Sequence, residues 1–292
     1  MGDILSATVW MHFYPHGCET LFVLGMKPDE ELLRLHFELS NRTRVELLRT
    51  LLRQPLNIAG LSKEHGLTHQ SCGKHLSRLI EVNLIDRDPE GLISITDYGM
   101  NILHLMEAPM FLSNNREYFS KHTLTGLPSE YIHRIGELNE AEFVDDVMLV
   151  FNNIVKMYND AEEYVYRITD RYLMLTVNGS LRALERGVPQ KIIDPTRFPS
   201  PPNFDDVLPF EQYWRKGLFE MKHLPCLDVF LAMSEKCVCA LSFPDPDGRF
   251  AYYGYMSEDI RVHKWCLDLF NHYWGMAESR KDFHWFRKRN EE

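Results

Sequence analysis

Residues 56–96 contain two short breaks in regular pattern, and their spacing constrains the fold more than any other feature of the chain. A helical pattern ends near Gly66, and a second one begins after Thr68. Further on, Asp88-Pro89-Glu90-Gly91 separates two runs rich in β-branched residues, which is typical of a two-stranded hairpin. The stretch therefore predicts a helix, a four-residue break, a second helix and a hairpin.

Local capping signals support these boundaries. Asn57 can cap the first helix, and Leu56 and Leu61 have the spacing of a hydrophobic staple around that cap. Gly66 can adopt the left-handed conformation that ends a helix, and Thr68 can cap the next one. We therefore expect a sharp turn between two helices with fixed ends.

The second helix, residues 68–80, has one apolar and one polar face. At helical spacing the apolar face is expected to bury Cys72, Leu76, Leu79 and Ile80. The opposite face carries side chains that can reach base edges and phosphates, as a recognition helix does in a major groove. We predict base-edge contacts from Gln70, Ser71, His75 and Arg78, phosphate contacts from Thr68, Lys74 and the hairpin residue Arg87, and a place for His69 in the same DNA-binding set.

Two helices are expected before this stretch and one after it. Residues 30–39 and 41–53 have helical patterns, and the second of these is expected to bury Val45, Leu48, Leu51 and Leu52 before Pro55 stops it. After the hairpin, Thr96 can cap a helix over 97–106.

Residues 29–106 resemble the winged-helix domain of the ArsR-like transcription regulators of bacteria and archaea. The resemblance lies in "LSNRTRVELL", in "KHLSRLIEVNLI" at the end of the second helix, and in "ITDYG" after the hairpin. It implies that the hairpin is a wing and that the partner is double-stranded DNA, bound by a homodimer.

The second half predicts a mixed α/β domain. A helical apolar face over 147–158 is followed by a strand at 163–170, a helix at 172–185 and a strand at 189–193, an order that suggests a parallel β-α-β pair. Further strands are expected at 217–223, 227–233, 238–243 and 250–255. A final helix over 259–276 is expected to bury Val262, Trp265, Cys266, Leu269, Phe270 and Tyr273.

This half also resembles a known group, the archaeal FilR-type regulators named for methanogenesis control. The similar segments are "NNREYFSKH", "LPSEYIHRIGEL", "ALERGVPQKII" and "HKWCLDLF". The resemblance implies a two-domain α/β protein: a winged helix-turn-helix fused to a mixed α/β sensor domain similar to the phospholipase D fold, as in the TrmB regulators. We predict an arm at 1–26, the winged helix at 27–106, a helical linker at 107–135, the effector-sensing domain at 136–279 and a basic, aromatic tail at 280–292.

Charge and hydropathy restrict the classes of function. The formal net charge of the 292 residues is -10, which argues against binding nucleic acid through bulk charge. Between residues 40 and 100, however, eight basic side chains face seven acidic ones, a net of +1 that leaves about -11 for the remainder. No apolar run has membrane-spanning length, and the first 26 residues contain no Lys or Arg, so we expect a cytoplasmic protein that does not enter a membrane.

Enzymatic signatures are missing from the sequence. Phospholipase D catalysis needs a His-x-Lys pair, and none of the 13 histidines has lysine two places later; His263 and Lys264 are adjacent. The sequence also has no phosphate-binding glycine loop, Gly-x-Ser-x-Gly or His-Glu-x-x-His motif. We therefore expect a regulator without a catalytic site or a cofactor.

Candidate effector residues lie at the carboxyl end of the strand at 163–170. Arg167 and Arg171 can receive a carboxylate or phosphate beyond the carboxyl end of a strand, with Asp170 orienting them. Tyr253 and Tyr255 are candidate pocket walls. The alternative is that the charged groups form a surface ion-pair network and that the tyrosines only decorate a hairpin.

Cysteine placement leaves a second mode of regulation open. Cys237 and Cys239 share one face of a strand and can bind a soft metal if Cys226 lies on a neighbouring strand, although buried thiols without a ligand are the favoured interpretation. We expect no metal in the arm either, where His12, His16 and Cys18 are ligand types in an irregular segment. The alternatives to an effector-sensing regulator are a metal- or thiol-responsive regulator and a protein-interaction module with a degenerate winged helix.

Overall fold

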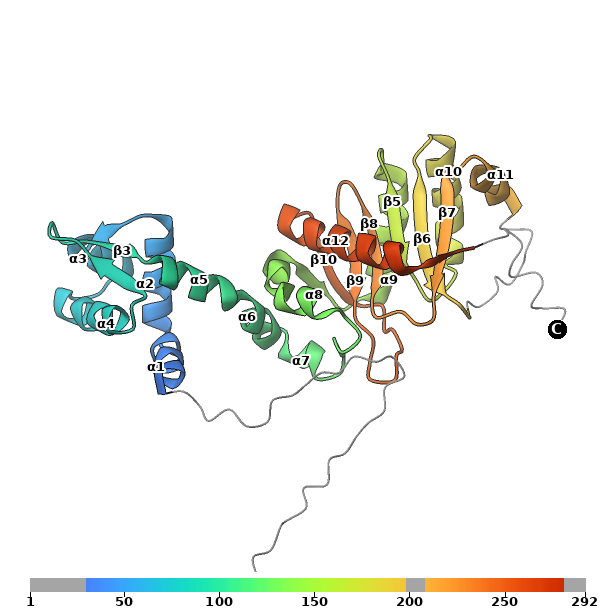
Figure 1. Ribbon diagram of the computed structural model, residues 1–292. Helices are drawn as coiled ribbons and strands as arrows, with labels where there is room; N and C mark the ends of the chain where they lie inside the picture. Colours follow the sequence, from blue (N-terminus) through green and yellow to red (C-terminus); the bar gives the residue numbers. More distant parts are fainter. Residues whose placement is uncertain (1–29, 198–207, 281–292) are drawn as a thin grey trace, which may run out of the picture. The chain divides into compact units, whose positions relative to one another are not determined.

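A computed structural model describes residues 30–197 and 208–280, and the chain divides into two units, one ending at Ile102 and the other beginning at Leu103 (Figure 1). The expected arm at 1–26 and tail residues 281–292 lie outside the described residues. Over the two described ranges, no helix has both the length and the apolar character that a membrane span requires.

The first unit begins with α1 (Glu30–Leu39) and α2 (Arg42–Arg53), and the Asn41 side chain caps α2 by accepting from the Arg44 N–H at 3.1 Å. The buried apolar residues of α2 are Leu47, Leu48 and Leu51. Val45, which was also expected to be buried, is only half-buried, and the expectation that Leu52 is buried was wrong, since its exposure is 52%. Positions 47, 48 and 51 lie on one face, and each further residue turns the helix by about 100°, which carries Leu52 toward solvent.

A three-stranded antiparallel sheet completes the first unit. Its strands are β1 (Leu56–Asn57), β2 (Ile85–Arg87) and β3 (Leu92–Ile95), in the order β1-β3-β2. The β2–β3 pairing confirms the expected hairpin, and Gly91 adopts the positive φ of 89° that its turn requires. The sequence did not indicate β1, because two residues are too few to show a period.

The second unit is built on a mixed sheet that contains eight strands among the described residues, in the order β11-β7-β6-β5-β8-β9-β10-β4 (Figure 1). Both β5–β6 and β6–β7 are parallel, which confirms the predicted β-α-β pair, and the other pairings are antiparallel. The strands are β4 (Glu142–Val144), β5 (Val165–Ile168), β6 (Gln190–Pro195), β7 (Phe219–Leu224), β8 (Phe230–Ser234), β9 (Val238–Ser242), β10 (Gly254–Ser257) and β11 (Glu278–Ser279).

One strand begins later than its sequence suggested. The expected strand at 250–255 starts only at Gly254, because Tyr252 has a φ of 66° and interrupts the extended backbone. Gly254 itself lies so close to the Leu241 carbonyl of β9 that a Cβ atom would collide with it.

Helices cover both faces of this sheet (Figure 1). On β5, Tyr166 stacks on Phe270 of α12 (Ile260–Met276) at a ring separation of 4.5 Å, whereas the next residue, Arg167, reaches Tyr158 of α9 (Val147–Asp160). Neighbouring residues of a strand point to opposite faces, so α9 and α12 lie on opposite sides. All six residues expected to be buried on α12 are buried. The predicted crossover helix consists of η2 (Met174–Thr176) and α10 (Val177–Glu185), and η4 (Leu208–Phe210) and α11 (Glu211–Arg215) precede β7.

The segment expected to link the domains contributes to the second core. It contains α6 (Glu107–Asn114), α7 (Arg116–Phe119) and α8 (Ser129–His133), and is followed by η1 (Ile135–Glu140). Phe111, Tyr118 and Tyr131 are buried in the same apolar cluster as the sheet. Trp265 of α12 donates a hydrogen bond to the Tyr131 carbonyl at 3.2 Å, so these helices are integral to the second unit.

Candidate nucleic-acid interface and effector pocket

The helix α4 (His69–Glu81) has a fixed beginning. The Thr68 hydroxyl accepts from the Ser71 N–H at 3.1 Å, as an N-cap does. The preceding helix, α3 (Ile58–His65), is capped by Asn57, whose side chain accepts from the Gly60 N–H at 2.9 Å, and it ends at Gly66 with φ 63°. The predicted caps are therefore confirmed, and they set the turn between the two helices.

The inner face of α4 packs largely as expected. Cys72, Leu76 and Leu79 are buried in the interior of the first unit. Ile80 was expected on this face but is 38% exposed, so that prediction was wrong. Ile80 stands about 100° around the helix from Leu79, at the margin of the buried stripe.

The polar face of α4 presents exposed side chains, two of which have no partner among the described residues. Gln70 and Lys74 are exposed, and their side chains form no hydrogen bond or ion pair with any described residue. His69 is exposed as well, whereas Ser71 and His75 are half-buried. Burial, and then the nearby Arg44 charge, lower the pKa of His75, which favours its neutral form.

Arg78 has a partner that sequence reasoning missed. Its Nη1 lies 3.6 Å from Oε1 of Glu38, a buried carboxylate of α1. The other oxygen of Glu38 lies 3.1 Å from Nε of Arg44, which also donates to the Glu38 carbonyl at 2.7 Å. The Arg78 side chain is still 54% exposed, so part of its guanidinium remains available to another acceptor.

The β2–β3 hairpin presents a second cation. Asp88 closes the turn by accepting from the Leu92 N–H at 2.7 Å, and Arg87 immediately precedes it. The exposed Arg87 side chain forms no hydrogen bond or ion pair within the described ranges.

The charged residues predicted as effector contacts at the end of β5 have surroundings that differ from expectation. Arg167 is 4% exposed and donates to the Tyr158 hydroxyl at 3.2 Å and to Thr169 at 3.4 Å. Asp170 accepts from the Tyr252 hydroxyl at 2.8 Å, and the Arg171 guanidinium lies over the Tyr252 ring at 4.2 Å. Tyr252, which the sequence did not single out, is therefore the tyrosine that joins this group.

The two predicted tyrosines lie elsewhere in the second unit. Tyr255 is 1% exposed, and its ring centroid is 5.3 Å from that of Tyr118. Burial raises the pKa of Tyr255 well above its usual value. Tyr253 instead lines a pocket beside α7.

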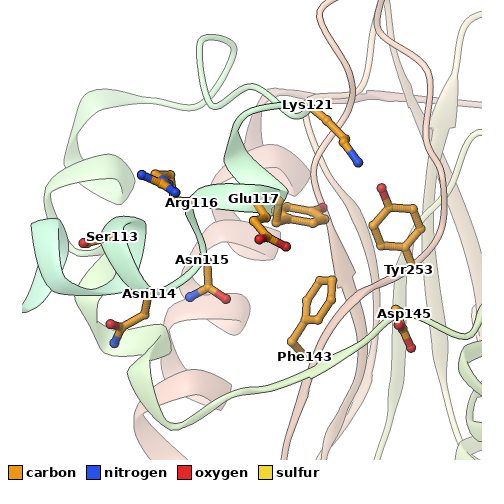
Figure 2. Close-up of a pocket in the computed structure, with 10 residues that line it drawn as sticks. Ser113, Asn114, Asn115, Arg116, Glu117, Lys121, Phe143, Asp145 and Tyr253 are labelled. Atoms are coloured by element: carbon orange, nitrogen blue, oxygen red, sulfur yellow. The ribbon is translucent and has the colours of Figure 1, made fainter.

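That pocket has a volume of about 600 Å³ (Figure 2). Its lining residues come from α6, α7 and the segments around β4 and β10: Ser113, Asn114, Asn115, Arg116, Glu117, Tyr118, Lys121, Phe143, Asp145 and Tyr253. In Figure 2 the Lys121 ammonium and the Tyr253 hydroxyl point toward one another. Both charge signs and three aromatic rings line this space.

The charged lining groups of the pocket are available to a ligand. The side chains of Arg116, Glu117, Lys121 and Asp145 make no hydrogen bond or ion pair with another described residue. The aromatic wall is fixed, because the Tyr118 hydroxyl accepts from the Phe243 N–H at 2.9 Å and its ring stacks on His122 at 3.9 Å. Sequence reasoning found only Tyr253 here, since the lining residues between Ser113 and Lys121 come from the segment interpreted as a linker, and Phe143 and Asp145 belong to no recognisable motif.

The three candidate metal-binding thiols do not converge. Cys237 and Cys239 have their sulfur atoms 3.0 Å apart. Cys226 is exposed and precedes β8, whereas Cys237 follows the turn at the far end of β8. Cys226 therefore does not lie on a strand beside the other two thiols, as a shared metal site would require. No group of three potential metal ligands occurs within residues 30–197 and 208–280.

Comparisons with known proteins give only distant similarities. No protein-family model matches the chain, and no curated protein matches it. Among solved structures, the archaeal chromatin protein TrmBL2 is 18% identical, with a TM-score of 0.38 over 86% of this chain and 98% of its own. NucT from Helicobacter pylori is 12% identical, with a TM-score of 0.36 over 48% and 97% of the two chains. Nuc from Salmonella typhimurium, a phospholipase D family member, is 8% identical, with a TM-score of 0.32 over 44% and 89%. These scores are too low to assign a fold or a function.

Proposed function

We propose that the first unit is a winged helix-turn-helix domain that binds specific sequences of double-stranded DNA and that the protein is a transcription regulator. The observation that carries the proposal is the polar face of α4, where Gln70 and Lys74 are exposed beyond a fixed N-cap and have no partner within the described chain. The capped helix pair and the β2–β3 hairpin supply the arrangement that such a domain needs.

Roles follow from side-chain chemistry and exposure. Gln70 is suited to the bidentate pattern of adenine, and Arg78 to that of guanine through the guanidinium edge that Glu38 leaves available. Ser71 and His75 are further base-edge candidates, and Thr68, Lys74 and Arg87 serve phosphates. A homodimer would place two copies of α4 at half-sites about 34 Å apart.

Fluorescence anisotropy with duplexes selected from a random pool tests this role. We expect Lys74→Ala to weaken binding to all duplexes and to lower the slope of log K against log salt by about 1, since it removes one phosphate contact. Gln70→Ala should instead reduce discrimination at one base pair, by about 1–3 kcal/mol. Lys216→Ala, which removes an exposed charge from the second unit, is the matched control and should change neither quantity.

The opposite result has a defined meaning. If no duplex binds in a salt-dependent way and Lys74→Ala behaves like Lys216→Ala, the polar face of α4 is not a DNA surface. The first unit would then be a protein-interaction module.

The second unit is proposed to sense a small effector in the pocket beside α7. A volume of about 600 Å³ suits a metabolite-sized ligand, and free cations and carboxylates beside aromatic walls suit a zwitterion. Arg167 remains a weaker candidate, because it is buried and already donates to Tyr158 and Thr169. Because α6 and α7 directly follow α5 (Asp97–Leu105) in the chain, occupation of this pocket can bear on the segment that leads to the first unit.

Thermal unfolding of the full chain with a panel of zwitterionic metabolites tests this assignment. A bound effector should raise the melting temperature, and Lys121→Met should abolish that rise while leaving the ligand-free melting temperature nearly unchanged, since Lys121 is exposed. A rise that survives Lys121→Met but is lost in Arg167→Met would move the effector site to the end of β5.

A further inference from the structure

The turn between β8 and β9 places two thiols in contact. Ser234 donates its N–H to the Cys237 carbonyl at 3.0 Å, so Glu235 and Lys236 form a tight connection. Next to this turn the register of the β8–β9 pairing shifts: Met233 pairs with Val238, but Ala232 pairs with Ala240. Cys239 is thereby the extra residue of a bulge on β9.

The bulge explains how residues two apart bring their sulfur atoms together. In a regular strand, alternate Cα atoms are about 6.6 Å apart, near the upper limit for a disulfide. A bulge bends the strand and shortens this span. The Sγ atoms of Cys237 and Cys239 are 3.0 Å apart, which is closer than ordinary non-bonded sulfur contact.

The surroundings of the pair favour thiol chemistry over metal binding. Cys237 is half-buried and Cys239 is buried, with the Ser234 hydroxyl 3.9 Å from the Cys237 sulfur. No third Cys, His, Asp or Glu completes a metal site there among the described residues. Zinc needs four ligands, usually three or four of them from protein, so two thiols alone do not form its usual site.

We propose that Cys237 and Cys239 form a redox-active dithiol, which closes to an intrachain disulfide on reaction with a small-molecule disulfide of the glutathione type. This inference is independent of the proposed DNA-binding and effector-sensing functions, because it concerns only the oxidation state of one hairpin.

The difference in exposure indicates which thiol reacts first: Cys237 is half-buried, whereas Cys239 is buried. The Cys237 thiolate attacks one sulfur of the oxidant, the S–S bond of the oxidant breaks, and one half leaves as a thiolate. The Cys239 sulfur then attacks the mixed disulfide on Cys237, releases the second half as a thiolate and gives up its own proton to solvent, from which the two released thiolates are protonated. The two protein thiols lose two electrons and two protons, and the oxidant is reduced to two thiols.

The test reads one peptide by mass spectrometry. Trypsin cleaves after Lys236 and Arg249, so both cysteines occur in a single fragment, residues 237–249. The reduced full-length protein is treated with oxidised glutathione, quenched with N-ethylmaleimide and digested. We expect this fragment to carry two maleimide groups before oxidation, and to carry none and be lighter by two hydrogen atoms afterwards.

Single substitutions separate the steps. Cys239→Ser should accumulate a stable glutathione adduct on Cys237, because the resolving thiol is gone, and Cys237→Ser should lose most of the reaction. Cys226→Ser, which removes an exposed thiol outside the pair, should leave disulfide formation in the fragment unchanged.

Three results would overturn the proposal. They are a glutathione adduct that persists on Cys237 in the unsubstituted protein, oxidation of Cys226 while fragment 237–249 stays fully maleimide-labelled, and one equivalent of zinc that protects both thiols until a chelator is added.

Discussion

At the scale of single residues, the Glu38 carboxylate joins two cations that belong to different helices, Arg44 of α2 and Arg78 of α4. Its side chain is 2% exposed and lies between Arg44 and Arg78. A buried charge is costly without partners, so these guanidinium groups are part of the reason that Glu38 is tolerated in the core.

Substitutions at Arg78 and Glu38 distinguish a role in reading DNA bases from a role in stabilising the fold. We expect Glu38→Gln to lower the free energy of unfolding by about 3 kcal/mol, because it leaves Arg44 without its buried counter-charge. Arg78→Ala should cost less than about 1 kcal/mol of stability, since its pair is long and half-exposed. It should nevertheless weaken specific DNA binding by about 1–3 kcal/mol. Urea unfolding and anisotropy give the two quantities, and equal stability losses for both variants would assign Arg78 to packing alone.

Reactivity of the thiols should depend on pH in two different ways. The hydrogen bond from Cys239 lowers the pKa of Cys237 to about 7, against burial and the Glu235 and Glu258 charges. Partial desolvation by the surrounding protein, and then the Asp228 charge, raise the pKa of the exposed Cys226 thiol above its usual value. Alkylation of Cys237 by iodoacetamide should therefore rise through pH 7 and level off, while that of Cys226 is still rising at pH 9. The charges of Asp160 and Lys156 also act on the neighbouring Cys239 thiol. Identical profiles for Cys237 and Cys226 would contradict the assignment.

At the scale of secondary-structure elements, the first unit depends on a close approach at the start of α5 (Asp97–Leu105). The Thr96 hydroxyl caps this helix by accepting from the Gly99 N–H at 2.9 Å. A Cβ atom on Gly99 would collide with the Leu84 carbonyl at the base of the hairpin. Position 99, the glycine of the segment "ITDYG", therefore requires glycine because a larger side chain would not fit. Its backbone φ is helical and does not by itself require glycine.

A pair of glycine substitutions tests this packing. Gly99→Ala should lower the free energy of unfolding by about 1–3 kcal/mol through overpacking. Gly73→Ala, in the middle of α4, meets only the Ile58 Cδ1 atom at 3.5 Å and should stabilise by roughly 0.5–1 kcal/mol. Urea denaturation measures both values, and a destabilisation of the same size in Gly73→Ala would show that any added methyl group in these helices is harmful.

At the scale of the whole molecule, the two units differ in net charge and have separate hydrophobic cores. With α1 included, residues 30–102 carry nine Lys and Arg against ten Asp and Glu. The first unit is thus near neutral, so the DNA binding proposed for it must rely on individually placed contacts. The large apolar cluster of the second unit begins at Phe111 and includes none of the buried residues of α1–α4.

Separate cores should unfold separately. We expect two transitions in calorimetry, with Gly99→Ala lowering only the one that belongs to the first unit. Gly254→Ala, whose Cβ would collide with the Leu241 carbonyl, should lower only the other. A single transition that both variants shift equally would show that the units unfold as one.

Local spacing in the sequence was enough to determine the caps at Asn57 and Thr68, the turn after Arg87, the parallel β-α-β pair and the buried face of α12. Each of these depends on residues within a few turns or one crossover of each other, where sequence distance limits spatial distance. Only the tertiary structure joined Asp170 to Tyr252, Glu38 to Arg78, and α7 to Tyr253 in the pocket. These contacts depend on sheet order, register and one interrupted strand, and no local pattern encodes them. The pair Cys237 and Cys239 shows both levels: the sequence placed the thiols two apart, and the bulge against β8 brought them into contact.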